Sequence, residues 1–129
     1  MSTMELLVYA SDMFQRERLL GAIKCCSHQW HVETFKDFRA FNRRLKNFCT
    51  GEMWLVMVTS DLAELCRMTT VCEIIRSRRS ILVLPDHRRE TVRVGHTLYP
   101  RFISYIDSDF SDVSSVLSTV SRKAMAKRN

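Results

Sequence analysis

The chain has 129 residues, of which 46% are hydrophobic and 26% are charged, a composition typical of one soluble globular domain. Its first residues, MSTMELLVYAS, carry no basic segment before the apolar run, and no apolar stretch approaches the roughly 20 residues that span a bilayer. We therefore expect no signal peptide, no membrane contact and a cytoplasmic location. The formal net charge of +6 would suit an acidic partner, although basic residues spread over most predicted helices usually form a solvated face.

Strand-like and helix-like patterns alternate from the start of the chain. Residues 5–11 are a short apolar run typical of a buried strand, and residues 12–26 follow with an amphipathic helical pattern. Residues 31–35 alternate apolar and polar side chains, as expected for a strand near the edge of a sheet. The next helix is predicted from a stripe of apolar residues at helical spacing: Phe38, Phe41, Leu45 and Phe48.

The third and fourth units have strongly apolar strands. Residues 54–61, WLVMVTSD, run from a buried strand into a polar tip, and a helix is predicted over residues 62–78. Residues 80–86 form another buried strand, which ends at a proline. Residues 87–100 carry the weakest helical pattern, because the apolar stripe is thin and Gly95 lowers helix propensity.

The last unit pairs a strand over residues 101–109 with a helix over residues 110–127. The tail past Lys123 is expected to fray, so the predicted domain spans residues 1–123 and residues 124–129 form a basic C-terminal tail. Five strand-and-helix units predict an α/β fold, because parallel strands need crossover helices and are buried on both faces. We expect a single-domain, doubly wound, five-stranded parallel sheet in the flavodoxin-like order 2-1-3-4-5, which puts the half-exposed second strand at an edge.

In this architecture, ligands gather at the carboxyl ends of the strands. The residues that follow the strands are therefore the candidate site. They are Ala10, Ser11, Asp12, Thr59, Ser60, Asp61, Pro85, Asp86, Asp107, Ser108 and Asp109.

The segments YASDMFQRERL, WLVMVTSDL, SILVLPD and SYIDSDF, with the five-unit rhythm, resemble the receiver domain of two-component response regulators over about residues 4–123. That family carries a pair of acids after the first strand for Mg²⁺ and an aspartate after the third strand that accepts phosphate. The resemblance places Ala10 and Ser11 at the paired acids, with Asp12 just after them. It places Thr59 at the phosphoacceptor position, followed by Ser60 and Asp61.

The later strands depart from the family in the same way. The resemblance puts Pro85 where the family has a hydroxyl residue and Ser108 where it has a lysine, while Tyr105 fits the aromatic switch position. Ala10 offers no ligand to Mg²⁺, and a Thr59 hydroxyl is a weak nucleophile without an adjacent base. We therefore expect a pseudo-receiver that is not an enzyme and has no cofactor, with a degenerate phosphoacceptor pocket formed by Ala10, Ser11, Asp12, Thr59, Ser60, Asp61, Pro85 and Ser108.

Two of the tip aspartates have a structural explanation. Asp12 and Asp61 each precede a predicted helix, with Gln15 and Glu64 three residues later, which is the pattern of a helix N-cap. We favour capping over catalysis or metal ligation for both. A weak cation or small-ligand site remains an alternative, formed by the tip carboxylates Asp12, Asp61, Asp107 and Asp109.

Other chemistry is not indicated. The cysteines form no C-x-x-C pair, so neither a disulfide framework nor a zinc knuckle is predicted, and most are expected to be buried thiols: Cys25, Cys26, Cys49, Cys66 and Cys72. The adjacent pair Cys25-Cys26 leaves a redox role open. The histidines lack metal-ligand spacing, and the three glycines belong to no phosphate-binding loop, so we predict no metal site.

The leading functional hypothesis is a non-catalytic receiver-like signalling module that binds a protein partner without aspartyl phosphorylation. The resemblance nominates the surface of the helix after the fourth strand, the fifth strand and the last helix, for a partner or for a homodimer. The candidate residues there are Arg88, Arg89, Arg93, Tyr105 and Lys123. The alternative of nucleic-acid binding rests on the basic segments in the later half of the chain, although no nucleic-acid motif is present.

Overall fold

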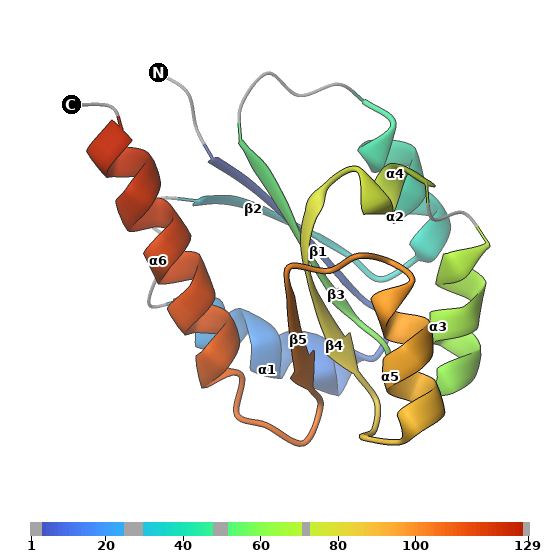
Figure 1. Ribbon diagram of the computed structural model, residues 1–129. Coiled ribbons are helices and arrows are strands. Elements are labelled where there is room, and N and C mark those ends of the chain that lie inside the picture. The colour runs from blue at the N-terminus through green and yellow to red at the C-terminus, as the bar shows by residue number, and fades with distance from the viewer. Residues whose placement is uncertain (1–3, 25–29, 48–51, 71–72, 128–129) are drawn as a thin grey trace.

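The computed structural model describes residues 4–24, 30–47, 52–70 and 73–127. Strands and helices alternate along the chain (Figure 1). The elements are β1 (Met4–Ala10), α1 (Met13–Ile23), β2 (Trp30–Phe35), α2 (Phe38–Leu45), β3 (Met53–Val58), α3 (Leu62–Thr69), α4 (Glu73–Arg76), β4 (Arg79–Leu84), α5 (Arg89–His96), β5 (Phe102–Tyr105) and α6 (Ser111–Lys127).

All five strands are parallel and lie in the order β2-β1-β3-β4-β5, which confirms the predicted flavodoxin-like topology. Every residue of β3 is buried, whereas β2 at the sheet edge is only partly buried. This contrast explains why the central strand is continuously apolar and the edge strand alternates. The fold is a single doubly wound α/β sheet.

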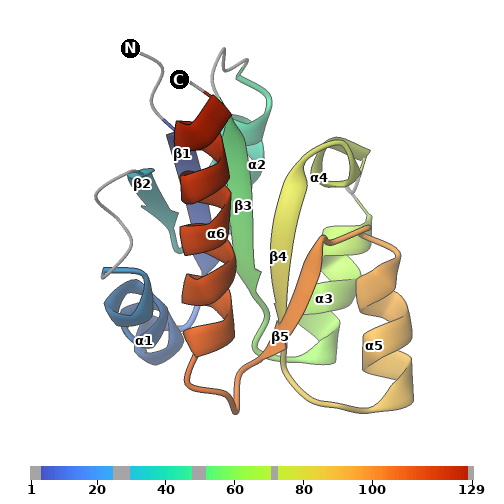
Figure 2. The same cartoon turned by 60° about the vertical axis from the view of Figure 1, so that its left-hand side comes forward.

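Helices cover both faces of the sheet (Figures 1 and 2). Alternate side chains of β1 point to opposite faces, so Leu6 and Val8 pack with α1 and α6, while Leu7 and Tyr9 pack with α2, α3, α4 and α5. The weakly predicted fourth helix forms as α5. Its Gly95 lies so close to β4 that an added Cβ would come within 3.0 Å of Leu84 Cδ2, which gives the glycine a packing role.

The helix predicted over residues 62–78 is wrong in its extent, because it is two helices. α3 ends at Thr69, where the hydroxyl groups of Thr69 and Thr70 donate to the carbonyls of Cys66 and Arg67, at 2.6 and 2.7 Å. Such back-bonding competes with the helical pattern and favours a helix end. The short α4 follows, and residues 71 and 72 lie outside the described residues.

Other boundaries also differ from the prediction. α1 is described from Met13 to Ile23, and residues 25 and 26 of its predicted range lie outside the described residues. α6 continues past Lys123 to Lys127. Cys66 is exposed, contrary to the expectation that most cysteines are buried. The remaining cysteines, including the pair Cys25-Cys26, and the predicted stripe residue Phe48 lie outside the described residues. Within the described ranges, no helix is both long and apolar enough to cross a membrane.

Candidate functional site

The residue that follows β3, Thr59, is hydrogen-bonded to the backbone of β4. Thr59 is fully buried, and its hydroxyl donates to the carbonyl oxygen of Val83 at 2.8 Å. Its backbone N–H donates to the same oxygen at 3.0 Å. The Thr59 hydroxyl therefore points at the backbone of the neighbouring strand and offers no accessible nucleophile.

A carboxylate that the sequence analysis assigned only to helix capping occupies the centre of the strand tips. Glu64, in the first turn of α3, is only 6% exposed. Its Oε2 accepts hydrogen bonds from the Tyr9 hydroxyl at 2.8 Å and from Ser11 Oγ at 2.7 Å. Its Oε1 accepts from the Ser60 backbone N–H at 2.8 Å, so this one side chain joins the tips of β1 and β3 to α3.

The capping prediction indicates why Glu64 was missed. The Asp61-x-x-Glu64 pattern predicts that Glu64 reaches back to its own N-cap residue. The carboxylate instead binds the N–H one residue earlier and extends across to β1. The sequence signal that a buried partner was needed is Tyr9, a hydroxyl-bearing residue inside the apolar run from Leu6 to Ala10.

The contact with Glu64 and the aromatic packing around Tyr9 set the protonation state of its hydroxyl. Its ring lies on Phe38 and Phe41, with centroid separations of 5.4 and 5.5 Å. Burial, then the hydrogen bond and charge of Glu64, raise the pKa of the Tyr9 hydroxyl well above its usual range. Tyr9 therefore stays protonated and acts as a hydrogen-bond donor inside the sheet.

The two predicted N-caps are confirmed. Asp12 Oδ2 accepts from the Gln15 N–H at 2.8 Å, and Asp61 Oδ1 accepts from the Glu64 N–H at 2.8 Å. Gln15 does not complete a capping box, because its Oε1 accepts from Arg18 at 2.6 Å. Both aspartates therefore stabilise helix starts.

The loop between β5 and α6 is tied down by Arg18 of α1. The guanidinium donates to the carbonyl of Ile106 at 2.9 Å and to the carbonyl of Ser108, and it lies 4.6 Å from the ring centroid of Phe110. Ser108 Oγ, at the position where the resemblance expects a lysine, accepts from the Phe110 N–H at 3.2 Å. The cation nearest this tip is thus engaged with backbone carbonyls.

The tips of β4 and β5 are linked by a histidine. His87, just after Pro85 and Asp86, stacks on Tyr105 with a centroid separation of 3.7 Å and an interplanar angle of 15°. Its Nε2 lies 3.1 Å from Asp107 Oδ2. The aromatic residue at the switch position therefore contacts a side chain of the β4–α5 loop.

The acidic tips do not converge on one point. Asp12 and Asp61 cap helices and Asp107 contacts His87, while the N–H and hydroxyl of Ser111 lower the pKa of Asp109. Among the described residues, the only group with three potential metal ligands within 4.8 Å of one another is elsewhere, at Glu5, His31 and Glu33. There Arg44 lies 3.7 Å from Glu5 and 3.2 Å from Glu33, so a cation already compensates both carboxylates.

The candidate interaction surface divides into two parts. Arg88, Arg89 and Arg93 are exposed at the start of α5 and along it, and Tyr105 is half-buried in the adjacent β5. Arg88 pairs with Asp86 at 3.2 Å. Lys123 is not part of this group, because it lies near the amino ends of the strands, beside Arg79 and Arg101.

No protein-family model and no curated protein sequence matches the chain. Among solved structures, the chain is similar to a pilus assembly-related protein from Burkholderia pseudomallei, at 14% identity and a TM-score of 0.64, over 91% of this chain and 90% of that one. It is also similar to a response regulator from Burkholderia pseudomallei with a phosphorylated aspartic acid, a calcium ion and citrate, at 10% identity and a TM-score of 0.62, over 96% of this chain and 72% of that one. At these identities the likeness shows a receiver-like fold.

Proposed function

We propose that this chain is a receiver-like signalling module that binds a protein partner and is not switched by aspartyl phosphorylation. The observation that carries the proposal is the Glu64 network at the strand tips. Its carboxylate is buried and accepts hydrogen bonds from Tyr9, Ser11 and Ser60. A phosphoryl group entering there would meet a negative charge that is already satisfied by donors.

The chemistry of phosphoryl transfer supports the same reading. Mg²⁺ is usually held by one or two protein carboxylates together with the phosphate and water, but Ala10 offers none. The hydroxyl of Thr59 is buried and bonded to the backbone, so it cannot replace an aspartate nucleophile. Ser108 supplies no cation for the transferred group, and Arg18 binds the Ser108 carbonyl instead.

The switch residue supports phosphorylation independence as well. In the receiver family, the aromatic residue moves with a hydroxyl at the end of the fourth strand. Here that position is Pro85, which has no hydroxyl, and Tyr105 stacks on His87 at 3.7 Å. We expect the Tyr105 environment to stay unchanged when Mg²⁺ and a phosphate mimic are added, and a clear shift of its NMR signals would contradict this.

The direct test is intact mass after incubation with acetyl phosphate and Mg²⁺. The expected result is no adduct at the mass of one phosphoryl group. Asp12→Asn and Asp61→Asn are the matched variants, because they remove the only carboxylates that follow β1 and β3 directly. A stoichiometric adduct that either variant removes would overturn the proposal.

The partner surface is tested by charge reversal. Arg88, Arg89 and Arg93 are exposed on or beside α5, so Arg89→Glu with Arg93→Glu should leave the fold intact. We expect this pair to weaken binding of a purified partner, because rim charges set the association rate. Binding that is indifferent to these reversals would exclude the α5 side from the interface.

A further inference from the structure

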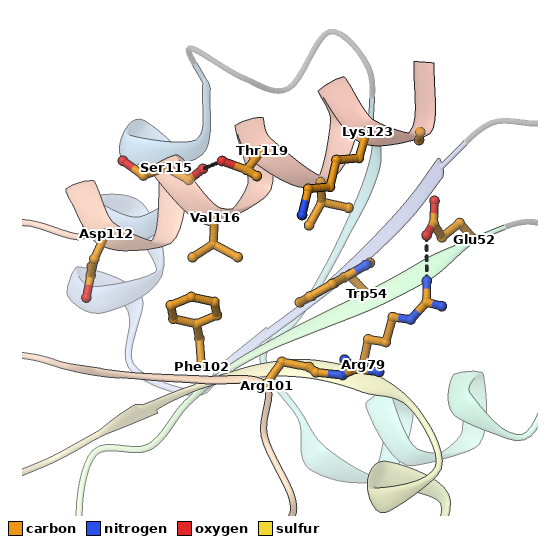
Figure 3. Close-up of a pocket in the computed structure, with 12 residues that line it drawn as sticks. Glu52, Trp54, Arg79, Arg101, Phe102, Asp112, Ser115, Val116, Thr119 and Lys123 are labelled. Atoms are coloured by element: carbon orange, nitrogen blue, oxygen red, sulfur yellow. Dashed lines mark hydrogen bonds and ion pairs between the residues drawn. The ribbon is translucent and has the colours of Figure 1, made fainter. Parts of the chain in front are cut away.

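A groove runs between α6 and the amino ends of β3, β4 and β5, with a volume of about 720 Å³ (Figure 3). We call it the α6 groove and define it by Trp54, Arg79, Arg101, Phe102, Val116 and Lys123. It lies at the end of the sheet opposite the strand tips, because Arg79 and Phe102 are the first residues of their strands. No residue of α5 lines it.

The groove exists because α6 leaves part of the sheet uncovered. α6 lies against α1 and the β1 and β3 side of the sheet, while β4 and β5 extend beyond it (Figure 2). Phe102, at the start of the edge strand, is consequently 52% exposed. Phe102 and Trp54 line the groove from the sheet, and Val116 points toward Phe102 from α6, so the groove has apolar side chains on both sides (Figure 3). An exposed aromatic beside a concave apolar surface is typical of a binding site.

One end of the groove is positively charged. Arg101 and Lys123 make no ion pair within the part of the chain that the structure describes, whereas Arg79 is paired with Glu52 at 2.5 Å. Asp112 lies at the far end of α6, where it accepts hydrogen bonds from Ser104 Oγ and the Val113 N–H. Uncompensated cations therefore gather at the Lys123 end.

The floor of the groove also holds an unused donor. Trp54 is 6% exposed, and its indole N–H is buried with no hydrogen-bond acceptor among the described residues. In Figure 3 the ring nitrogen lies at the end of the indole that faces away from Phe102. Because this N–H is itself buried, a ligand in the groove meets the Trp54 ring and not the donor unless the neighbouring side chains move.

We propose that the α6 groove binds a segment of a protein partner that carries a large apolar residue next to aspartate or glutamate. The apolar residue packs on Phe102, Trp54 and Val116, and the carboxylates lie against Arg101 and Lys123. This inference rests on the proposed function, because it gives the partner its chemistry. It adds a second contact, at a surface separate from the α5 side.

The charges favour a peptide over the other occupants. A nucleic acid needs a series of phosphate contacts, but among the described side chains that line the groove only two cations are unpaired, and Glu52 and Asp112 line it as well. A second copy of the chain would bring the same unpaired cations, and each copy carries a formal charge of +6. An acidic apolar segment complements both features of the groove.

The test selects binders from a display library of random short peptides on the whole chain. Enriched peptides should combine an aromatic or large aliphatic residue with neighbouring acids. One enriched peptide is then labelled and titrated by fluorescence anisotropy. The Trp30→Phe variant leaves Trp54 as the only tryptophan, so its emission should change on binding.

Substitutions in the α6 groove test whether the selected peptide binds there. Reversing two rim charges, Arg101→Glu with Lys123→Glu, should weaken the peptide at least about 20-fold, and Phe102→Ala about tenfold. The matched control is Arg39→Glu with Arg43→Glu, exposed on α2 on the other face of the sheet, which should change the Kd by less than about twofold. Circular dichroism checks that every variant is folded.

Several results would overturn the proposal. They are no enriched peptide, enrichment of basic peptides, or acidic peptides whose Kd is unchanged by the rim reversals and by Phe102→Ala. Competition by duplex DNA that the rim reversals abolish would assign the groove to nucleic acid, and a dimer lost in the same variant would assign it to a second copy. A phosphoryl adduct would overturn the proposed function but leave the peptide result standing, so the two failures are distinguishable.

Discussion

Replacing Glu64 by alanine removes the acceptor that joins β1, β3 and α3. Three donors lose their partner: the Tyr9 hydroxyl, Ser11 Oγ and the Ser60 N–H. Ser11 and Ser60 are exposed, so water replaces most of what they lose, at about 0.5–1 kcal/mol each. Tyr9 is 3% exposed, and leaving its hydroxyl without an acceptor costs about 1–3 kcal/mol. The free energy of unfolding should therefore fall by about 2–5 kcal/mol, a large part of the stability of a small domain.

Urea unfolding followed by circular dichroism measures this change. Tyr9→Phe alone should cost about 1 kcal/mol, because Glu64 keeps its other donors. In the double variant the buried hydroxyl is gone, so the combined loss should be smaller than the sum by about 1 kcal/mol or more. Ser11→Ala is the matched control, since it removes an exposed donor to the same oxygen and should cost less than about 1 kcal/mol.

Two results would contradict a stabilising role for the Glu64 network. A Glu64→Ala variant within about 0.5 kcal/mol of the unmodified chain would mean that the network does not stabilise the fold. Strict additivity of the Tyr9 and Glu64 substitutions would mean that the 2.8 Å contact between them carries no coupling.

Three further predictions concern stability. Because the pKa of Tyr9 is raised in the folded chain, its contribution to stability is fully present below about pH 10, the pKa in the unfolded chain, and is lost as the pH rises further. Urea unfolding on either side of that pH should show the loss, and Tyr9→Phe should abolish it. Asp61→Ala removes an acceptor 2.8 Å from the Glu64 N–H and should lower the free energy of unfolding by about 1 kcal/mol. Asp61→Asn keeps a capping oxygen, so the thermal unfolding midpoint of that variant should stay close to that of the unmodified chain. Gly21→Ala should raise the free energy of unfolding by about 0.5–1 kcal/mol, because Gly21 lies inside α1 and an added Cβ meets nothing within 4 Å. A loss of stability on Gly21→Ala would contradict that argument.

Much of the architecture could be predicted from local pattern. The continuous apolar run of β3 and the alternation in β2 reflect burial on both faces or near an edge, and this fixed the strand order. The N-caps Asp12 and Asp61 could also be predicted, because a capping carboxylate and the N–H that donates to it lie three residues apart in the sequence. The short α4 was not predicted, because the apolar spacing continues at helical period past Thr69. The helix ends there because the hydroxyls of Thr69 and Thr70 bind backbone carbonyls.

The candidate site depends on contacts between residues far apart in the sequence. Tyr9 and Glu64 are 55 positions apart, and Arg18 meets the Ser108 carbonyl across 90 positions, so no local spacing predicts either pair. The surface residues show the same limit: Lys123 lies with Arg101 rather than with Arg88, because α6 runs back along the sheet to the amino ends of the strands. The sequence alone determined the parallel sheet, its order and the departures from the receiver pattern, because side-chain periodicity and residue identity are local. The position of Glu64 among the strand tips and the basic, apolar groove beside α6 followed from the three-dimensional packing alone, because both depend on how packed elements bring distant side chains together.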